Sequence, residues 1–237
     1  MFLKISNQFK SPNFDNRRKN IKIKYIIIHY TETKDLNDAL EILCNPDKKV
    51  SSHFVIDLDG GIFRLVDENK KAWHAGVSFW KKDKHLNDVS LGIEIVNDGG
   101  KKFTAIQIRS LVLLLKKLVK DFSVNNHNIL GHSDVAPERK IDPGIFFPWE
   151  KLRLHDFGLP LFNCTDSKRI NLSDDRLIIF LTNLKIIGFS QVNLKKLDYK
   201  TNKLIIDSFH RHFLKEMVGK IPSEKSLKIS NLLVSIL

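Results

Sequence analysis

Hydrophobic residues in the first two thirds of the chain recur with the spacing of strands. Residues 21–29 begin with alternating Ile and Lys and continue as an unbroken apolar run, which predicts a strand that becomes buried on both faces. Residues 52–57 and 61–66 flank an Asp-Gly-Gly sequence, a turn signal that predicts a β-hairpin. Residues 90–97 predict a further strand, so the pattern indicates a sheet.

Helical periodicity is clearest over residues 104–122. Thr104 and Gln107 have the spacing of a capping box, and apolar side chains then recur at i, i+3, i+4 and i+7. This helix is expected to pack across the sheet. The pattern predicts an α/β (α+β) fold with a mixed central β-sheet flanked by helices. Shorter elements are expected at residues 38–43 (helix), 129–130 (strand) and 149–155 (helix).

The pattern changes after residue 158, where Gly158-Leu159-Pro160 and a polar stretch at 163–167 interrupt it. Three short helices are expected beyond this point, and serine caps open the first and the third. Their expected ranges are 173–187, 201–216 and 223–236. We therefore divide the chain into a first domain (1–158), a linker (159–172) and a small C-terminal three-helix domain (173–237).

Composition narrows the class of protein. An apolar content of 42% in 237 residues is enough to bury a core, so disorder is not expected. Cys44 and Cys164 lack the paired spacing of a zinc ribbon or a disulfide scaffold, and we interpret both as reduced. The net charge of +12 comes from lysines spread along the chain without a run of five, so nucleic-acid binding is not expected.

The sequence also carries expectations about location and assembly. No segment has the length of a transmembrane span. The first ten residues lack a continuous apolar region and a small-residue cleavage site, so we expect a cytoplasmic protein, with the periplasm or cell envelope as the alternative. We expect a monomer.

Candidate chemistry is concentrated at two places. His29 ends the first buried strand, and the segment from Gly131 to Gly144 contains His132, Lys140 and Asp142. A lone histidine at the end of a strand is more often structural. Two His and one Asp, however, can bind zinc and leave one position open, as in metal-dependent hydrolases, whereas closed structural sites usually have four ligands and favour Cys.

Five segments carry a family resemblance: IIIHYTET, SSHFVIDLDGGIFRLV, AWHAGVSFW, LGIEIVND and GHSDVAPERKIDPG. They resemble the signature segments of the type 2 N-acetylmuramoyl-L-alanine amidases, the AmpD-like zinc enzymes that cut bacterial peptidoglycan. The opening SPNFDNRR and the C-terminal helices are similar to the AmiD-type members, which carry an additional C-terminal domain. The fragment from Asp207 to Phe213 resembles the second-helix motif of small peptidoglycan-binding domains; the alternative is a bundle that only packs on the first domain.

The resemblance implies roles for particular residues. His29, His132 and Asp142 would bind one Zn²⁺ per chain. Glu94 would be the general base and then the acid, and Lys140 would stabilise the developing oxyanion. Strand alternation supports the first of these two roles, since Glu94 shares a face with Gly92, which leaves room for substrate or water. Substrate contacts are expected from Trp73, His74, Trp80, Asn97 and Arg139.

Several histidines and aromatic residues have structural alternatives. Trp73 and Trp80 would belong to the core if the resemblance failed there, and Glu94 would face solvent. His53 is expected to be structural. His210 and His212 are two residues apart and cannot share one face of a helix, so they are poor ligands for one metal.

The expected activity is hydrolysis of the amide between N-acetylmuramic acid, or its 1,6-anhydro form, and L-alanine of the stem peptide, in cell-wall turnover. Peptidoglycan fragments or intact cell wall are the expected partners. The alternative is a non-catalytic peptidoglycan-recognition protein on the same scaffold. Serine and cysteine nucleophile mechanisms are not expected, because the chain has no nucleophile elbow and no Cys near a ligand histidine.

Overall fold

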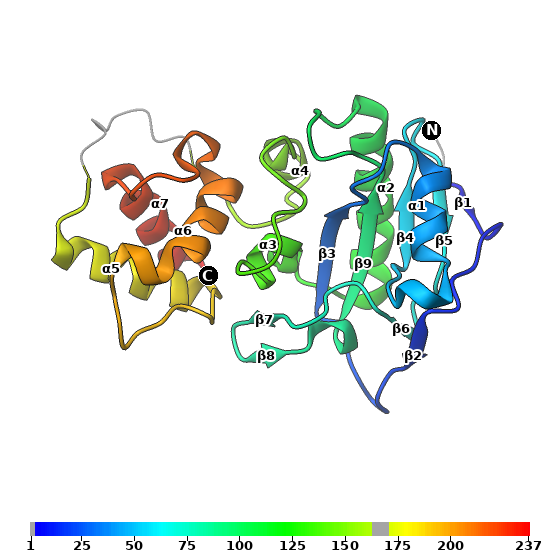
Figure 1. Ribbon diagram of the computed structural model, residues 1–237, viewed down its shortest axis with the longest axis horizontal. Coiled ribbons are helices and arrows are strands. Elements are labelled where there is room, and N and C mark those ends of the chain that lie inside the picture. The colour runs from blue at the N-terminus through cyan, green and yellow to red at the C-terminus, as the bar shows by residue number, and fades with distance from the viewer. Residues whose placement is uncertain (1–2, 163–170) are drawn as a thin grey trace.

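The computed structural model describes residues 3–162 and 171–237, and its centre is a six-stranded mixed sheet (Figure 1). The four strands β4, β9, β3 and β10 are parallel neighbours, β5 pairs antiparallel to β4, and β1 pairs parallel to β5. In spatial order the strands are β1 (Ile5–Ser6), β5 (Ile62–Arg64), β4 (Phe54–Ile56), β9 (Ser90–Ile95), β3 (Tyr25–Tyr30) and β10 (Ile129–Gly131). The mixed sheet agrees with the expected fold class.

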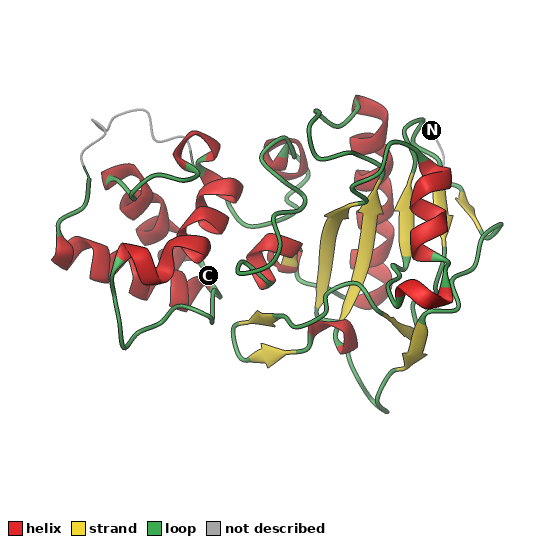
Figure 2. Cartoon of the chain, in the orientation of Figure 1, coloured by secondary structure: helices red, strands yellow, loops and turns green. Residues whose placement is uncertain are grey.

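Short ribbons and single 3₁₀ turns make up the less regular parts of the fold (Figure 2). The ribbons are β2 (Phe14–Asn16) with β6 (Lys70–Ala72), and β7 (Phe79–Trp80) with β8 (Asp83–Lys84). The 3₁₀ turns are η1 (Pro46–Lys48), η2 (Leu86–Asp88), η3 (Asn126–Asn128) and η4 (Lys215–Met217).

One expected strand begins later than its sequence pattern indicates. Residues 21–24 alternate correctly, but β3 starts at Tyr25. Its neighbour β9 begins at Ser90, which lies opposite Tyr25, so the preceding residues have no further ladder to join. A strand needs a partner for its backbone groups, and the side-chain pattern alone does not provide one.

Helix α2 (Ala105–Phe122) covers one face of the sheet, with Thr104 and Gln107 forming the expected capping box. Its apolar side packs on Ile26 and Ile28 of β3 and on the matching residues of β9. The opposite face carries α1 (Leu36–Leu43) and α3 (His132–Val135) near its two sides (Figure 1), whereas α4 (Trp149–Arg153) packs into the same core cluster as α2. Because side chains alternate along β3, His29 lies on the face away from α2.

The described residues 171–237 form three α-helices: α5 (Asp174–Ile187), α6 (Tyr199–Phe213) and α7 (Glu224–Ile236). The middle helix starts two residues earlier than expected, because Asp198 caps it through the N–H of Thr201, and it ends at Phe213, before η4. Cys44 is a free thiol, and Cys164 lies outside the described residues. Within the described ranges, no helix combines the length and the apolar character needed to cross a membrane.

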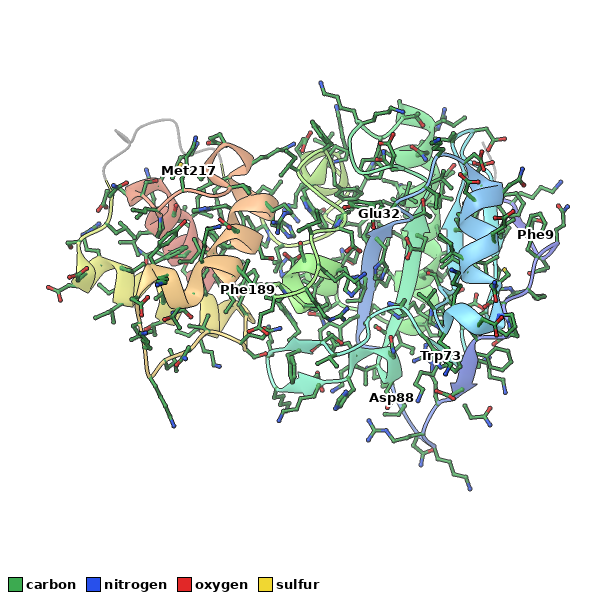
Figure 3. All side chains as sticks on the ribbon, viewed as in Figure 1. Phe9, Glu32, Trp73, Asp88, Phe189 and Met217 are labelled. Carbon is green, nitrogen blue, oxygen red and sulfur yellow. The ribbon has the colours of Figure 1, made fainter. Side chains whose placement is uncertain are left out.

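The three helices share a hydrophobic core with the sheet. One cluster of buried side chains includes Tyr25 and Ile27 of β3 as well as Phe189, which precedes α6. The Trp80 ring is 1% exposed and packs edge-on against the Phe189 ring, with 5.0 Å between the centroids. Figure 3 shows Phe189 on the side of the bundle that faces the sheet. The division of the chain at residue 158 therefore stays a prediction, since the packing is continuous across it.

A chain that ends at residue 162 should be poorly soluble and should unfold at a lower temperature than the full chain. Truncation would expose the apolar side of Trp80 and of the residues around it, and large exposed apolar patches promote association. Gel filtration and thermal unfolding of the two proteins side by side would measure this. A monomeric truncated protein with an unchanged melting temperature would show that the helices are a separable module.

Candidate metal centre and active site

The site is built at the carboxyl ends of three parallel strands. His29 near the end of β3 is paired in register with Glu94 of β9, and Gly131, the last residue of β10, is paired with Ile28. His132 follows Gly131 directly, as the first residue of α3. Parallel strands bring their carboxyl ends to one edge of the sheet, where ligands bind in open α/β folds. The strand pairing thus places both imidazoles and the Glu94 carboxylate together.

Three donor atoms converge at this edge. Nδ1 of His29 lies 3.0 Å from Nδ1 of His132, and Oδ2 of Asp142 lies 2.9 and 3.0 Å from these two nitrogens. All three residues are buried, and they form a group that could hold a metal ion. A tetrahedral Zn²⁺ with bonds of about 2.0–2.1 Å has ligands about 3.3 Å apart. The nitrogen and oxygen atoms therefore fit a metal ion with little adjustment.

The remaining ring nitrogens of both histidines are hydrogen-bonded to groups behind them. Nε2 of His132 lies 3.2 Å from the Ala75 carbonyl oxygen, and Nε2 of His29 lies 3.1 Å from Nδ1 of His74. The other nitrogen of His74 bonds the Ser90 hydroxyl, which donates to the Leu86 carbonyl. Such partners fix the tautomer and the orientation of metal-binding imidazoles.

The structure gives His74 a role that the sequence did not indicate. His74 lines the cavity, and its contact with substrate stays a prediction; both of its ring nitrogens are hydrogen-bonded inside the protein, so the residue also positions His29. The expected space beside Gly92 is also filled. A Cβ atom at Gly92 would lie 2.5 Å from the His74 ring, so glycine is required here to admit the imidazole. Alternation along β9 correctly placed Gly92 and Glu94 on one face, but it did not indicate that the His74 ring fills the space beside Gly92.

The donor atoms open into a cavity of about 620 Å³. One wall is apolar and comes from α1 and the segment after it, and the other is polar and comes from the ends of β3 and β9 and the loop that carries Asp142. The apolar wall consists of Ala39, Ile42, Leu43 and Val50. The polar side includes Glu32, Glu94, Arg139 and Lys140. The volume is within the range of small-molecule sites in proteins.

Electrostatics favour the ionisation states that a metal requires. Burial, followed by the nearby His132, lowers the pKa of His29 to about 4, so its imidazole is neutral at pH 7. Burial alone would raise the pKa of Asp142, but the His132 and His29 imidazoles beside it bring that pKa below its ordinary value. Metal ions bind neutral imidazole and ionised carboxylate. His29 and Asp142 are therefore in the ionisation states that bind a metal ion.

Glu94 has a different environment. Its side chain is buried, and its Oε2 atom has no hydrogen-bond partner among the described residues. Burial, and then the negative charge of Asp142, raise its pKa well above the ordinary value, although Lys140 opposes this shift. A buried carboxyl group without partners that lines a cavity is a candidate for proton transfer.

Arg139 and Lys140 are the cations of the cavity. Arg139 is anchored, because its Nε donates to the Val77 carbonyl at 3.0 Å and its guanidinium also bonds the Ala75 carbonyl. Lys140 is exposed at the cavity wall, two residues before Asp142. Both cations therefore lie beside the donor atoms.

Three expected substrate contacts do not lie in this cavity. Trp80 is in the core shared with the helices, where aromatic residues are more often found. Asn97 is 6% exposed, and its side chain bonds the Gly99 amide and the Lys101 carbonyl, so it stabilises a turn. The Trp73 indole donates to Asp15 in a separate hollow, and Figure 3 shows Trp73 well away from Glu32. The sequence motifs that contain Trp73, Trp80 and Asn97 did not indicate that these side chains lie outside the cavity.

Two kinds of residue near the site had no signal in the sequence. Ser90, the first residue of β9, orients His74 through a hydrogen bond. Helix α1, which is distant in sequence from the Asp142 loop, supplies the apolar wall of the cavity. His53, which we expected to be structural, bonds the Gly92 amide through Nδ1 and the Arg17 guanidinium through Nε2. It is fully buried and supports the strand that carries Glu94.

Replacing Glu94 with Gln should stabilise the metal-free protein at neutral pH. Because the folded state raises the pKa of Glu94, the stability that its protonated form contributes is present below the unfolded pKa of about 4.3 and is lost as the pH rises through the folded value. At pH 7 the Glu94→Gln variant should therefore have a higher melting temperature than the chelator-treated wild type, and the difference should vanish near pH 4.

The exposed Glu150 provides a matched control, and Glu150→Gln should show no such pH-dependent difference. A Glu94→Gln protein less stable than wild type at pH 7 would contradict the assigned environment of the carboxyl group.

Comparison with known proteins agrees with this geometry. AmiD of Escherichia coli is 36% identical over 166 residues, which cover 63% of this chain and 58% of AmiD. The 1,6-anhydro-N-acetylmuramyl-L-alanine amidase AmpD of Haemophilus influenzae is 33% identical over 162 residues, which cover 61% of this chain and 88% of AmpD. The match to AmiD thus spans little more than half of the length of that relative.

A solved structure of E. coli AmiD, in complex with its substrate anhydro-N-acetylmuramic acid-L-Ala-D-γ-Glu-L-Lys, aligns with a TM-score of 0.79 and 26% identity. The alignment covers 93% of this chain and 92% of that one, so it extends beyond the sheet into the C-terminal helices. The family model Amidase_2, described as N-acetylmuramoyl-L-alanine amidase, matches residues 19–145. These residues include the strand of His29, Glu94 and the loop of His132 and Asp142, and the chain belongs to the N-acetylmuramoyl-L-alanine amidase family.

Proposed function

We propose that this chain is a zinc-dependent N-acetylmuramoyl-L-alanine amidase. Its reaction would be hydrolysis of the amide between the lactyl group of N-acetylmuramic acid, or the 1,6-anhydro form, and L-alanine of the stem peptide. The observation that carries the proposal is the buried triangle of His29, His132 and Asp142, which opens into a cavity beside the unpartnered carboxyl group of Glu94.

His29, His132 and Asp142 would hold one Zn²⁺ per chain, with a net charge of about +1 at the site when a single carboxylate is counted. When bound, zinc supplies Lewis-acid activation of the amide carbonyl and of a water molecule. The protein contributes rigid ligands, because His74 and the Ala75 carbonyl hold the far side of each imidazole. Family membership supports this assignment.

Glu94 is the residue that would move protons. Because its pKa is raised, this carboxyl group accepts a proton more readily than an ordinary glutamate and can then return it. It would take a proton from the attacking water and deliver it to the nitrogen of the departing L-alanine. Oε2 has no hydrogen-bond partner among the described residues, so it is free to accept the proton in the first step and to donate it in the second.

Lys140 would stabilise the negative charge that develops on the carbonyl oxygen as the amide becomes tetrahedral. Its side chain is exposed at the cavity wall beside Asp142, and its positive charge acts on both Glu94 and His29. Arg139 is held by two backbone carbonyls, and we propose that it attracts the carboxylates of the stem peptide.

The substrate class rests on the relatives. The solved AmiD complex contains an anhydromuramyl tripeptide, and AmpD is named for the 1,6-anhydro form. These relatives favour an anhydro-muropeptide as the substrate, and activity on the intact wall stays a prediction. A peptidoglycan-recognition protein without activity has no observation in its favour, because the three donor residues and Glu94 are all in place.

Metal analysis tests the ligand assignment. The purified chain should contain about one zinc per molecule, and His132→Ala should lose it, because two remaining donors do not form a stable zinc site. His127→Ala, which removes a half-buried histidine outside the cavity, is the matched control and should keep its zinc. Zinc that stays near one equivalent in His132→Ala would show that the assignment is wrong.

Activity assays test the role of Glu94. Glu94→Gln should bind zinc as wild type does but lose about a hundredfold or more in kcat, as expected when a positioned proton-transfer group is removed. Turnover should be measured on an anhydro-muropeptide and on intact sacculi, with Glu150→Gln as control. Full activity in Glu94→Gln would reject the mechanism, and absence of cleavage of both substrates by the wild type would reject the proposed function.

A further inference from the structure

Two of the three donor residues belong to one hydrogen-bonded loop. His132 begins α3, and Asp142 follows ten residues later. The N–H of Ser133 donates to the carbonyl oxygen of Asp142 at 2.8 Å, which ties the two ends of the loop together. His29, by contrast, comes from strand β3 of the sheet. The distance between His29 and the other two donors therefore depends on where this loop is held.

Helix α6 holds the loop from behind at two points. The Ser208 hydroxyl donates to the carbonyl oxygen of Ser133 at 2.7 Å. Nδ1 of His212 donates to Oδ2 of Asp134 at 2.8 Å, and the same oxygen accepts the N–H of Gly131 at 2.7 Å. Both residues that α6 contacts, Ser133 and Asp134, follow His132 in the sequence, and Asp134 extends the restraint to Gly131, which precedes it.

The His212 contact is enclosed by protein. The side chains of His212 and Asp134 are each 1% exposed. The His212 ring stacks on the Trp149 ring, with 3.9 Å between centroids and an angle of 11° between the planes. Trp149 in turn packs close to Gly131. Water cannot readily replace a hydrogen bond that is buried in this way, so its loss would free the turn.

A second histidine on the same helix has no such connection. His210 is also buried, but its Nε2 bonds the Ser226 hydroxyl of α7, inside the helical bundle. The helix therefore presents one imidazole to the loop that carries His132 and another to its own bundle. Replacing His212 therefore disturbs the loop at His132, whereas replacing His210 disturbs only the packing of the helices.

We propose that α6 is a positioning element of the metal centre. His212, acting through Asp134, and Ser208, acting through Ser133, hold His132 at the distance from His29 that a bound metal requires. This inference rests on the proposed metal site. It gives the C-terminal helices a function in building that site, which is distinct from binding polymer.

The experiment measures the Kd for zinc in the full chain by competition with a chromophoric chelator. His212→Ala should weaken zinc binding by about 10- to 100-fold, as is typical when a residue that orients a metal ligand is removed. It should also shift the visible absorption bands of the Co²⁺-loaded protein. His212→Asn keeps an N–H donor near the position of Nδ1 and should restore most of the affinity. The matched control, His210→Ala, should keep the wild-type Kd and Co²⁺ spectrum even where its melting temperature falls.

Equal zinc affinity in wild type and His212→Ala would overturn the proposal, and so would equal weakening in His212→Ala and His210→Ala. If His212→Ala does not fold, Ser208→Ala removes a single hydroxyl group and should still weaken zinc binding several-fold, whereas a wild-type Kd in that variant would overturn the proposal. A wild-type chain that binds no zinc would instead reject the metal assignment on which this inference rests.

Discussion

The pairing of β3 with β9 and β10 is the constraint on which the rest of the site depends. These three parallel strands are in a register that sets His29 beside Glu94 and leads β10 directly into His132. Backbone hydrogen bonds keep this register, and a slip of one residue would turn His29 and Glu94 toward the opposite face, against α2. The sheet thus determines which side chains meet, and the loops adjust their orientation.

Burying this many polar groups at one edge is unfavourable unless each has a partner. Most of them have one: His29 is bonded to His74, His74 to Ser90, and His132 to a backbone carbonyl. Among residues 3–162 and 171–237, one oxygen of Glu94 has no partner, and neither do Oδ1 of Asp134 and Nε2 of His212 next to the turn at His132. Of these three atoms, only the Glu94 oxygen belongs to a residue that lines the cavity, and functional groups are often found in such environments.

The C-terminal helices also support the metal centre and the sheet. They complete the core under Tyr25 and Ile27, and α6 bonds the turn that presents His132. The residues that resembled a peptidoglycan-binding motif are largely occupied by these contacts: Phe209 is buried, Ser208 bonds Ser133 and His212 bonds Asp134. Packing therefore accounts for much of that pattern, and polymer binding by the helices stays a prediction.

The sequence by itself determined the strands, the long capped helix and the residues that carry chemistry, because hydrophobic periodicity and capping are local and the motif segments are specific. It could not determine that Trp80 and Asn97 are structural, that His74 supports His29, or that α6 holds the turn at His132. Each of these depends on which distant side chain occupies the neighbouring space. These neighbours are determined only when the sheet, the loop and the helices pack together, and the spacing of residues along the chain does not predict them.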